Sequence, residues 1–188
     1  HVVVSTYQAA SGKGQAAVEE LHLQHRQLAE GKRPTAKVFP APIAGNLVMD
    51  WKPGVDGYSE EELKLVHETR KILGDSSIGV TPTCVRVPVV TGHSETLFVR
   101  CADPIDADAV RQALRKAPGV VVQDDGYLPG KEPQPLACAG TDPVYVGRIR
   151  ADLAVPGAIV LWIVADNLRK GAALNAVQIA EVLVDRAG

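Results

Sequence analysis

The sequence has few cysteines, and they are scattered. Cys84, Cys101 and Cys138 are the three in 188 residues, and no two of them form a Cys-x-x-Cys pair. An odd number without that spacing argues against a disulfide scaffold or a zinc site and favours a reducing compartment, which we take to be the cytoplasm. Aromatic residues make up only 4% of the chain, so Val, Leu, Ile and Ala must fill most of its core.

Two further absences limit the partners that we expect. No apolar run reaches the ~20 residues of a membrane-spanning helix, and the longest candidate, residues 158–165, has the length of a strand. The net charge is -2 and there is no basic cluster. The attraction to phosphates that drives nucleic-acid binding therefore has no obvious source. We expect neither a membrane nor a nucleic acid as a partner.

The rest of the composition is that of an ordinary globular protein. Hydrophobic residues make up 46% of the chain and charged residues 22%, which is enough for a full core. The chain starts directly within a strand pattern, His1-Val2-Val3-Val4, without a methionine. We therefore expect it to be cut from a longer protein.

The residue pattern predicts several strands and few helices. Alternating and β-branched runs favour strands, whereas capping residues and apolar stripes favour helices. The expected strands are residues 2–7, 78–90, 94–101, 120–123, 144–150 and 158–164, with a short extended piece around Val38. The expected helices are residues 15–30, 59–73, 106–116 and those from 167 onward, and the irregular segments are 32–57 and 124–143. Strands joined by short turns predict an α+β sheet with helices on one face.

The first candidate for chemistry is the segment Gly12-Lys13-Gly14-Gln15-Ala16-Ala17. It matches Gly-x-Gly-x-x-Ala between a predicted strand and a predicted helix. A dinucleotide fingerprint also needs an acidic residue about 20 positions later, at the end of the next strand, and residues 37–40 contain none. Two interpretations remain, a glycine turn or an anion site formed by backbone N–H groups at the helix start.

Glu61 and Lys64 are the second candidate. Residues three apart on a helix are neighbours, with about 5–6 Å between their Cβ atoms. Opposite charges at that spacing could bind the two ends of a zwitterionic or phosphorylated substrate. The alternative is an exposed ion pair worth less than about 1 kcal/mol, and the spacing alone favours that alternative.

Arg86 and His93 are the third candidate. Along an unbroken strand they would lie about 23 Å apart on opposite faces, so a bend at Thr91-Gly92 is needed to bring them together. An arginine fork suits a carboxylate, and a histidine beside a glycine turn suits acid–base chemistry, although a histidine in a turn is more often merely solvated. His22 and His25 have no third ligand nearby, so a solvated helix face is the better interpretation there than a metal site.

Six segments, taken in order, resemble one family, the aspartate-semialdehyde dehydrogenases of the bacterial branch. The likeness runs from the first residue of the chain to the last. The segments are residues 3–9 (VVSTYQA), 68–73 (ETRKIL), 83–89 (TCVRVPV), 92–95 (GHSE), 146–150 (VGRIR) and 165–175 (ADNLRKGAALN).

The resemblance implies an activity and an architecture. The family reduces L-4-aspartyl phosphate to L-aspartate 4-semialdehyde with NADPH, reversibly, in the biosynthesis of lysine, threonine and methionine. In the reverse direction a cysteine thiolate attacks the aldehyde, a hydride passes to NADP, and phosphate releases the thioester. The implied fold is a glyceraldehyde-phosphate-dehydrogenase-like C-terminal domain, a mostly antiparallel mixed sheet with helices on one face. The other face is expected to pair two subunits of a homodimer.

The resemblance also implies roles for individual residues. His93 corresponds to the general acid/base, Arg86 to the residue that binds the substrate carboxylate, and Glu61 to the one that meets the substrate amino group. Lys64 belongs to the phosphate position. Gln8 orients the substrate and the thiol.

The cofactor and the nucleophile complete the expectation. Ser11, Gly12 and Asn167 correspond to NADP contacts, while most of the NADP site and the Asn-Cys-Ser/Thr nucleophile motif are absent from this sequence. Residues 1–165 are expected to form the substrate-binding and dimerisation domain. Residues 166–188 are expected to form a helix that packs on an NADP-binding domain. No metal is implied, and we expect this chain alone to be inactive.

Two other function classes remain open at this stage. A related acyl-phosphate reductase, such as N-acetylglutamyl-phosphate reductase, has a similar architecture but different motifs around the histidine. A non-catalytic paralogue acting as an interaction module would be expected to lose the set of site residues, which this chain retains.

Overall fold

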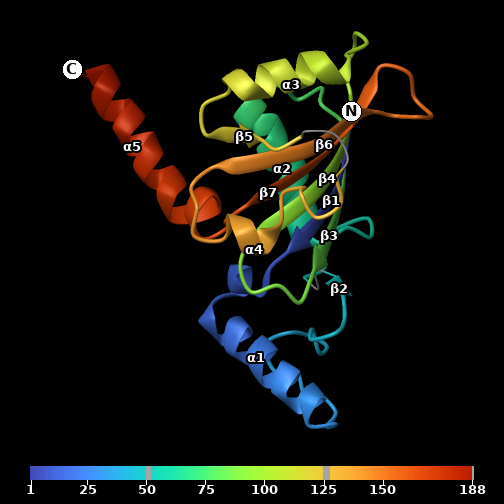
Figure 1. The fold of residues 1–188 in the computed structure, drawn as a ribbon, viewed down its shortest axis with the longest axis vertical. Helices are drawn as coiled ribbons and strands as arrows, with labels where there is room; N and C mark the ends of the chain where they lie inside the picture. Colours follow the sequence, from blue (N-terminus) through green and yellow to red (C-terminus); the bar gives the residue numbers. More distant parts are fainter. Residues whose placement is uncertain (50–51, 125–127, 188) are drawn as a thin grey trace.

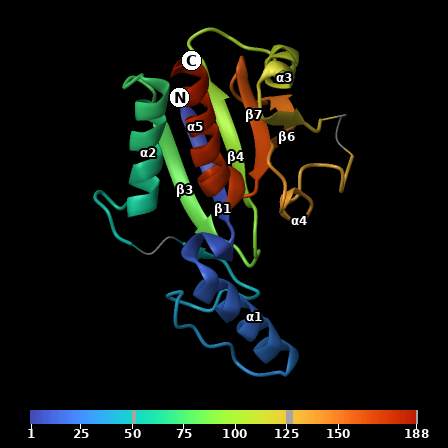
Figure 2. The same cartoon turned by 90° about the vertical axis from the view of Figure 1, so that its left-hand side faces the viewer.

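A computed structural model describes residues 1–49, 52–124 and 128–187 of the chain (Figures 1 and 2). Parts of three predicted segments lie outside the described residues. They are residues 50–51 of the irregular segment 32–57, residues 125–127 of the irregular segment 124–143, and residue 188 of the C-terminal helix. One sheet dominates the fold. Within the described residues it has seven strands, in the order β2-β3-β1-β4-β7-β6-β5.

The sheet is mixed and mostly antiparallel. Only the β1–β3 and β5–β6 pairs are parallel, and the other four pairs are antiparallel. The strands are β1 (Val2–Gln8), β2 (Val48–Met49), β3 (Val80–Arg86), β4 (His93–Arg100), β5 (Val120–Val122), β6 (Val144–Ala151) and β7 (Ala158–Ala165). The predicted fold class is confirmed.

Two long helices cover the same face of the sheet. Side chains at alternate strand positions share a face. Helix α3 (Ala107–Lys116) covers the β6 and β7 side of it, where Ile159 and Leu161 are buried together with the half-buried Leu97 of β4. Helix α2 (Glu60–Leu73) packs on β3, where Cys84 is fully buried while Thr83, on the opposite face, is exposed. We call this side, which carries Cys84 and Leu97, the helix face.

The opposite face carries aromatic residues and is only partly covered. The rings of Tyr7 and Trp162 lie 5.6 Å apart between their centroids, and Trp162 pairs with Thr96 across the β4–β7 ladder. Trp162 Nε1 donates to the carbonyl oxygen of Pro133 at 2.9 Å, so the segment that leads into the short helix α4 (Pro135–Cys138) lies against this face.

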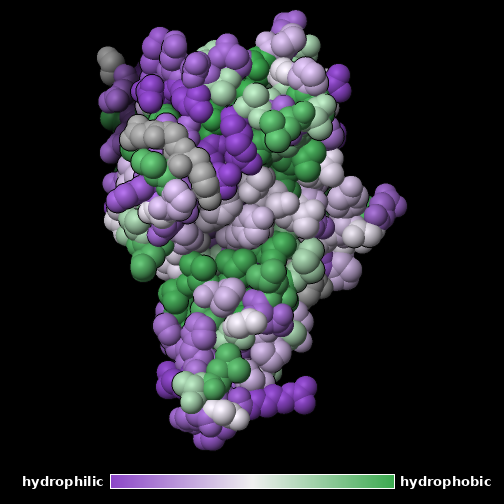
Figure 3. Space-filling view, turned by 45° about the vertical axis from the view of Figure 1, so that its right-hand side comes forward, coloured by the Kyte–Doolittle hydropathy of each residue, from purple (hydrophilic) through white to green (hydrophobic). Residues whose placement is uncertain are grey.

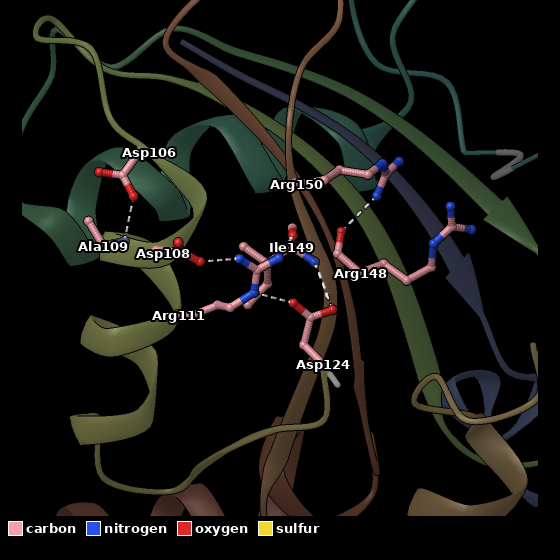
Figure 4. Close-up of polar contacts among 8 residues, drawn as sticks. All are labelled: Asp106, Asp108, Ala109, Arg111, Asp124, Arg148, Ile149 and Arg150. Carbon is pink, nitrogen blue, oxygen red and sulfur yellow. Dashed lines mark hydrogen bonds and ion pairs between the residues drawn. The ribbon is translucent and has the colours of Figure 1, made fainter. Parts of the chain in front are cut away.

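A partly buried ion pair fixes the irregular part of β6 (Figure 4). The register with β7 shifts between Gly147 and Arg150, and Arg148 has a φ of 51°. Asp124, whose side chain is 4% exposed, accepts from Arg111 Nε of α3 at 2.5 Å and from the Ile149 backbone N–H at 3.2 Å. Arg111 also donates to the Ile149 carbonyl. The two side chains thus satisfy backbone groups that the bulge removes from the ladder.

Helix α1 (Gln15–Ala29) extends away from the sheet with its own small core (Figure 1). The short helix η1 (Ala10–Lys13) connects it to β1. Two buried polar side chains on α1, Glu20 and Gln24, accept hydrogen bonds from the backbone of the segment 37–44. The buried apolar residues of this core are Ala10, Ala17, Leu21, Phe39, Ile43, Ala44 and Val48. We call α1 together with residues 32–48 the arm.

Four predicted elements need correction. The extended piece around Val38 is not a strand, because its backbone N–H groups are used by Glu20. The strand predicted for 78–90 ends at Arg86, and residues 87–92 turn away from the sheet. Helix α4 was missed within the predicted loop 124–143. The C-terminal helix begins with a π-helical turn at Arg169–Ala173 and continues as α5 (Leu174–Ala187), so Asn167 precedes it rather than starting it.

Helix α5 leads away from the sheet in Figure 1, and in Figure 2 it is seen in front of the sheet. Its side chains are mostly exposed, although several are large and apolar. The apolar residues exposed by 49–71% are Val177, Ile179, Val182, Leu183 and Val184. A helix of this composition normally covers an apolar surface.

Candidate active site

The sheet register brings Gln8, Arg86 and His93 to neighbouring positions on the helix face. Gln8 at the end of β1 lies directly opposite Arg86 at the end of β3. Tyr7 lies opposite Ser94 on β4, so His93 stands one step further, beside Gln8. Gln8 is 6% exposed and Arg86 is 4% exposed. The predicted pair Arg86 and His93 therefore shares one face, separated by a single intervening strand.

The peptide group at Ala9 connects the arginine and the histidine. Its N–H donates to His93 Nδ1 at 3.0 Å, and its carbonyl accepts from Arg86 Nη1 at 3.2 Å. Ala9 itself is fully buried. The bend that the sequence placed at Thr91-Gly92 begins earlier, since Ala10 N–H donates to the Val89 carbonyl at 2.8 Å. This backbone bond holds the 87–92 turn beside the end of β1.

Gly12 leaves open the space between the two functional groups. A methyl group added at Gly12 would lie 2.8 Å from Arg86 Nη1 and 3.1 Å from His93 Nε2. Contacts that close are tighter than nearly all real Cβ contacts, so a side chain there would have to displace one of the two groups. The glycine keeps the guanidinium and imidazole next to each other.

Ser11 and Asn167, two of the three predicted cofactor contacts, form a hydrogen-bonded pair. Asn167 Nδ2 donates to Ser11 Oγ at 3.0 Å, and Asn167 Oδ1 accepts from the Gly92 backbone N–H at 2.9 Å. Asp166 next to it is buried and accepts from the backbone of Gly140 and Leu168. These contacts join the end of β7, the turn before His93 and η1 into one cluster.

Burial and charge keep His93 neutral at physiological pH. Burial is the main cause that lowers the pKa of His93 from 6.5 to about 4. The positive charge of Arg86 acts in the same direction, and the negative charge of Asp166 opposes both. Glu95 lies two residues further along the same face of β4, and burial raises the pKa of its carboxyl.

Glu61 and Lys64 lie in the first turns of α2 and pair with each other. Their charged groups are 3.3 Å apart, with 27% of the Glu61 side chain and 54% of the Lys64 side chain exposed. Glu62 between them accepts from the Cys84 backbone N–H at 2.9 Å, which holds this end of α2 beside β3, two residues before Arg86. Glu61 and Lys64 therefore form the solvent-exposed ion pair that their spacing predicts. The Glu62 contact keeps this pair near the end of β3 that carries Arg86.

Two polar atoms of β1 on the helix face are buried and have no hydrogen-bond partner among residues 1–49, 52–124 and 128–187. They are Gln8 Oε1 and Thr6 Oγ1. An unsatisfied buried acceptor costs about 1–3 kcal/mol, so the position of Gln8 Oε1 beside Arg86 and His93 favours a ligand or another protein segment that donates to it.

Sequence reasoning missed the two groups that hold the site together, the backbone of Ala9 and the carboxylate of Asp166. Both lie within segments that carried the family resemblance, residues 3–9 and 165–175. No residue-type signal marks a backbone amide as functional, and an aspartate after a strand resembles any helix-capping residue.

Within residues 1–49, 52–124 and 128–187, no group of three or more His, Cys, Asp or Glu side chains has the arrangement of a metal site. His22 and His25 are exposed on α1, as expected for a solvated face. In the same described ranges, no helix has the length and apolar character needed to cross a membrane.

Comparison with known proteins finds relatives named aspartate-semialdehyde dehydrogenase. Aspartate-semialdehyde dehydrogenase of Synechocystis sp. is 47% identical over 186 residues, which cover 98% of this chain and 55% of that protein. The protein of the same name from Legionella pneumophila is 48% identical over 188 residues, covering 96% of this chain and 52% of that protein. The chain thus spans about half the length of the curated relatives it matches.

Solved structures agree with the sequence relatives. Aspartate semialdehyde dehydrogenase II of Vibrio cholerae, complexed with ASA, matches with a TM-score of 0.92 at 44% identity, covering 98% of this chain and 54% of that one. The Candida albicans enzyme with NADP matches with a TM-score of 0.67 at 26% identity, covering 97% of this chain and 49% of that one. The predicted glyceraldehyde-phosphate-dehydrogenase-like C-terminal fold is confirmed.

The sequence-family comparison covers most of the chain. The family described as "Semialdehyde dehydrogenase, dimerisation domain" matches residues 1–170, which include all of the sheet and the predicted site residues. The chain therefore belongs to the semialdehyde dehydrogenase dimerisation-domain family, and the relatives it resembles are aspartate-semialdehyde dehydrogenases.

Proposed function

We propose that this chain is the substrate-binding and dimerisation part of an aspartate-semialdehyde dehydrogenase. The whole protein would interconvert L-4-aspartyl phosphate and L-aspartate 4-semialdehyde in the biosynthesis of lysine, threonine and methionine. One observation carries the proposal: a guanidinium and an imidazole are both bonded to Ala9 and face the same space above Gly12. That pair suits a small substrate with a carboxylate and a reacting carbonyl oxygen.

The substrate-binding roles follow from the charge of each group. Arg86 would bind the α-carboxylate, because a planar guanidinium donates two parallel hydrogen bonds to it. Glu61 would meet the amino group, and Lys64 the phosphate. Gln8 would orient the substrate through its amide, whose buried oxygen has no partner within the described residues. His93 would act as the general acid/base for the reacting carbonyl oxygen, which is the role that the resemblance implies.

A small part of an NADP site would be formed by Ser11, Gly12 and Asn167. Gly12 provides room that a side chain would fill, and the Ser11–Asn167 pair presents an amide and a hydroxyl at the same edge. When bound, NADP would supply the acceptor for the hydride of the aldehyde. Most of its contacts would come from a nucleotide-binding domain.

The nucleophile is expected to come from outside this chain. The sequence contains no Asn-Cys-Ser/Thr motif, Cys84 and Cys138 are buried, and Cys101 is exposed. We propose that the 188-residue chain alone does not oxidise aspartate semialdehyde. NADPH formation by this chain from aspartate semialdehyde, NADP and phosphate would contradict that.

Two surfaces would complete the protein. The face of the sheet opposite α2 and α3 would pair two copies in a homodimer, and Figure 3 shows hydrophobic side chains gathered in a band across the middle of the molecule. A hollow of about 670 Å³ lies near the 87–92 turn, and its lining includes Val89, Val90, Pro135 and Leu136. These apolar side chains would add to the surface that is buried in the dimer. The segment 166–188 would pack on the NADP-binding domain through its exposed apolar residues.

The test uses the active protein that contains this chain. Initial rates are measured with aspartate semialdehyde and with N-acetylglutamate semialdehyde, each with NADP and phosphate. A preference for aspartate semialdehyde by several orders of magnitude is expected. A preference for the N-acetylated substrate would move the chain to the related acyl-phosphate reductases, and no turnover of either would favour a non-catalytic interaction module.

A further inference from the structure

We infer that the hollow beside the 87–92 turn holds helix α4 of a second copy of this chain, with Leu136 of the partner subunit at its centre, so that the partner subunit supports the turn that leads into His93. The inference rests on the proposed function, in which two copies pair through the face of the sheet opposite α2 and α3.

The hollow has an apolar lining that comes from two segments. Val89 and Val90 of the turn line one side, and Pro135 and Leu136 of α4 line the other. The two segments are neighbours in Figure 1, and they are in contact, since a methyl group added at Gly92 would lie 3.0 Å from the Cα and Cβ atoms of Pro135. With a volume of about 670 Å³, the hollow is too large for one side chain and suits a short helix.

Leu136 is an apolar projection beside this hollow. It is 91% exposed, and Val90 across the hollow is 37% exposed. One exposed leucine alone is ordinary on a protein surface. Here the exposed leucine stands next to an apolar hollow of matching chemistry, so the surface carries both halves of an apolar contact.

A second copy of the same chain fits such a surface. In a two-fold dimer the same patch lies on both sides of the interface, so a projection on each copy enters the hollow of the other. The hollow also continues onto the proposed pairing face, because Gln134 and Pro135 line a second hollow together with Thr96 and Trp162 of that face. The matched family is described as a dimerisation domain, which favours a second copy as the occupant.

The turn connects the hollow to the backbone of η1. The Val89 carbonyl accepts from the Ala10 N–H at 2.8 Å, and the Val90 carbonyl accepts from the Ser11 N–H at 3.0 Å. The two valines that line the hollow therefore also hold the segment that carries Ser11. A partner helix packed on these valines restrains that segment.

Pro135 provides a second connection to the site. Gly92, which Pro135 contacts, donates its N–H to Asn167 Oδ1 at 2.9 Å, and Asn167 Nδ2 donates to Ser11 Oγ at 3.0 Å. Packing of the partner subunit against α4 thus reaches the Ser11–Asn167 pair as well as the residue before His93.

Leu136→Asp in the active protein tests the contact between the subunits. Because Leu136 is 91% exposed, the substitution leaves the fold of each subunit intact and places a charge in the apolar contact. We expect the dissociation constant of the dimer, measured by sedimentation velocity over a series of concentrations, to rise at least about 30-fold.

Two further variants make this result specific. Leu153→Asp is the matched control, because Leu153 is fully exposed in the turn between β6 and β7, and its dimer should remain as tight as that of the wild type. Leu136→Met keeps the apolar volume and should also keep the dimer. A dimer of Leu136→Asp as tight as that of Leu153→Asp would overturn the inference.

Amide hydrogen exchange in the same variants tests the support of the turn. Segments 8–12 and 87–92 should exchange about tenfold faster or more in monomeric Leu136→Asp than in dimeric Leu153→Asp. Residues 43 and 44 of the arm, which are bonded to Gln24, should exchange equally in both. Equal exchange of the turn in monomer and dimer would contradict the support. Faster exchange in a Leu136→Asp protein that is still dimeric would mean that Leu136 packs within its own subunit, which also contradicts the inference.

Both measurements are independent of turnover. An active dehydrogenase whose dimer and turn do not respond to Leu136→Asp defeats the inference alone. A protein that oxidises neither semialdehyde, but whose dimer and turn respond as expected, supports the inference and defeats only the proposed activity.

Discussion

The Glu62 carboxylate accepts a hydrogen bond from the Cys84 backbone N–H at 2.9 Å and so joins the first turn of α2 to β3. Its other oxygen accepts from the Ser59 backbone N–H at 2.8 Å, while Ser59 Oγ accepts from the Glu62 N–H. One side chain thus completes a capping box and fixes the helix on the sheet. The carboxylate of the neighbouring Glu61 takes part in none of these three hydrogen bonds, which agrees with the substrate-binding role proposed for it.

Glu62 and Glu61 should respond differently to the same substitution. Glu62→Gln places an amide N–H₂ against one of two backbone donors, so we expect the free energy of unfolding to fall by about 1–3 kcal/mol. Glu61→Gln removes only an exposed ion pair and should change it by less than about 1 kcal/mol. Urea denaturation of the two variants compares them. If Glu62→Gln is as stable as Glu61→Gln, the contact with Cys84 contributes little.

Gln24 should be needed for the arm to keep its shape. Its Oε1 accepts from the backbone of Ile43 at 2.7 Å and of Ala44 at 3.0 Å. Gln24→Ala leaves both buried donors unsatisfied, so we expect a loss of about 2 kcal/mol or more and faster amide exchange at residues 43 and 44. Gln15→Ala, at an exposed position on the same helix, is the control. Unchanged exchange at both amides in Gln24→Ala would show that the segment is held by packing alone.

Arg86 and His93 should affect different kinetic constants in the active protein. Arg86→Lys keeps the charge but loses the bidentate fork, so KM for aspartate semialdehyde should rise about tenfold or more while kcat changes less. His93→Ala should lower kcat by about 10²–10⁴-fold, since the acid/base for the reacting oxygen is lost. Steady-state kinetics separate the two constants. Parallel changes in KM and kcat for both variants would argue against these assignments.

The free energy of unfolding should fall as the pH is lowered below neutrality, because the folded chain disfavours protonation of His93. The pKa of His93 is about 4 in the folded chain, whereas its ordinary value, which we take for the unfolded chain, is 6.5. Between these pH values the unfolded chain binds more protons than the folded chain, so acid favours unfolding. The contribution is complete above about pH 6.5 and disappears as pH falls toward about 4; linkage limits it to about 3 kcal/mol. Urea denaturation at several pH values should show a shallower decline for His93→Gln, and identical slopes would refute the shift.

Helix α5 should be the least protected helix of the 188-residue chain. Its apolar side chains are largely exposed, and an isolated helix of this length is marginal in water. Amide exchange in α5 should therefore be faster than in β1, β4 and β7. Protection equal to that of the sheet would mean that α5 packs on a surface of this chain or of a second copy.

Much of the architecture follows from local pattern. The strand runs and the helices that start at residues 59 and 106 were predicted from the pattern, because alternation, caps and turns act over a few residues. The mixed, mostly antiparallel sheet was implied by the family resemblance. The resemblance segments then selected the family, and the comparisons confirm it. The errors fall where the backbone departs from regular elements, near Val38, in residues 87–92, at α4 and at the start of α5.

The site itself depends on contacts between distant segments. Residue types suggested Arg86 and His93, but their convergence depends on β1 lying between β3 and β4 and on the Ala9 peptide, more than 75 residues away in sequence from either side chain. One backbone N–H, that of Ala9, holds the His93 ring, and the missing side chain of Gly12 leaves the space beside that ring and Arg86 open. A linear pattern cannot show these features, because they arise from register and burial, which the whole sheet determines at once.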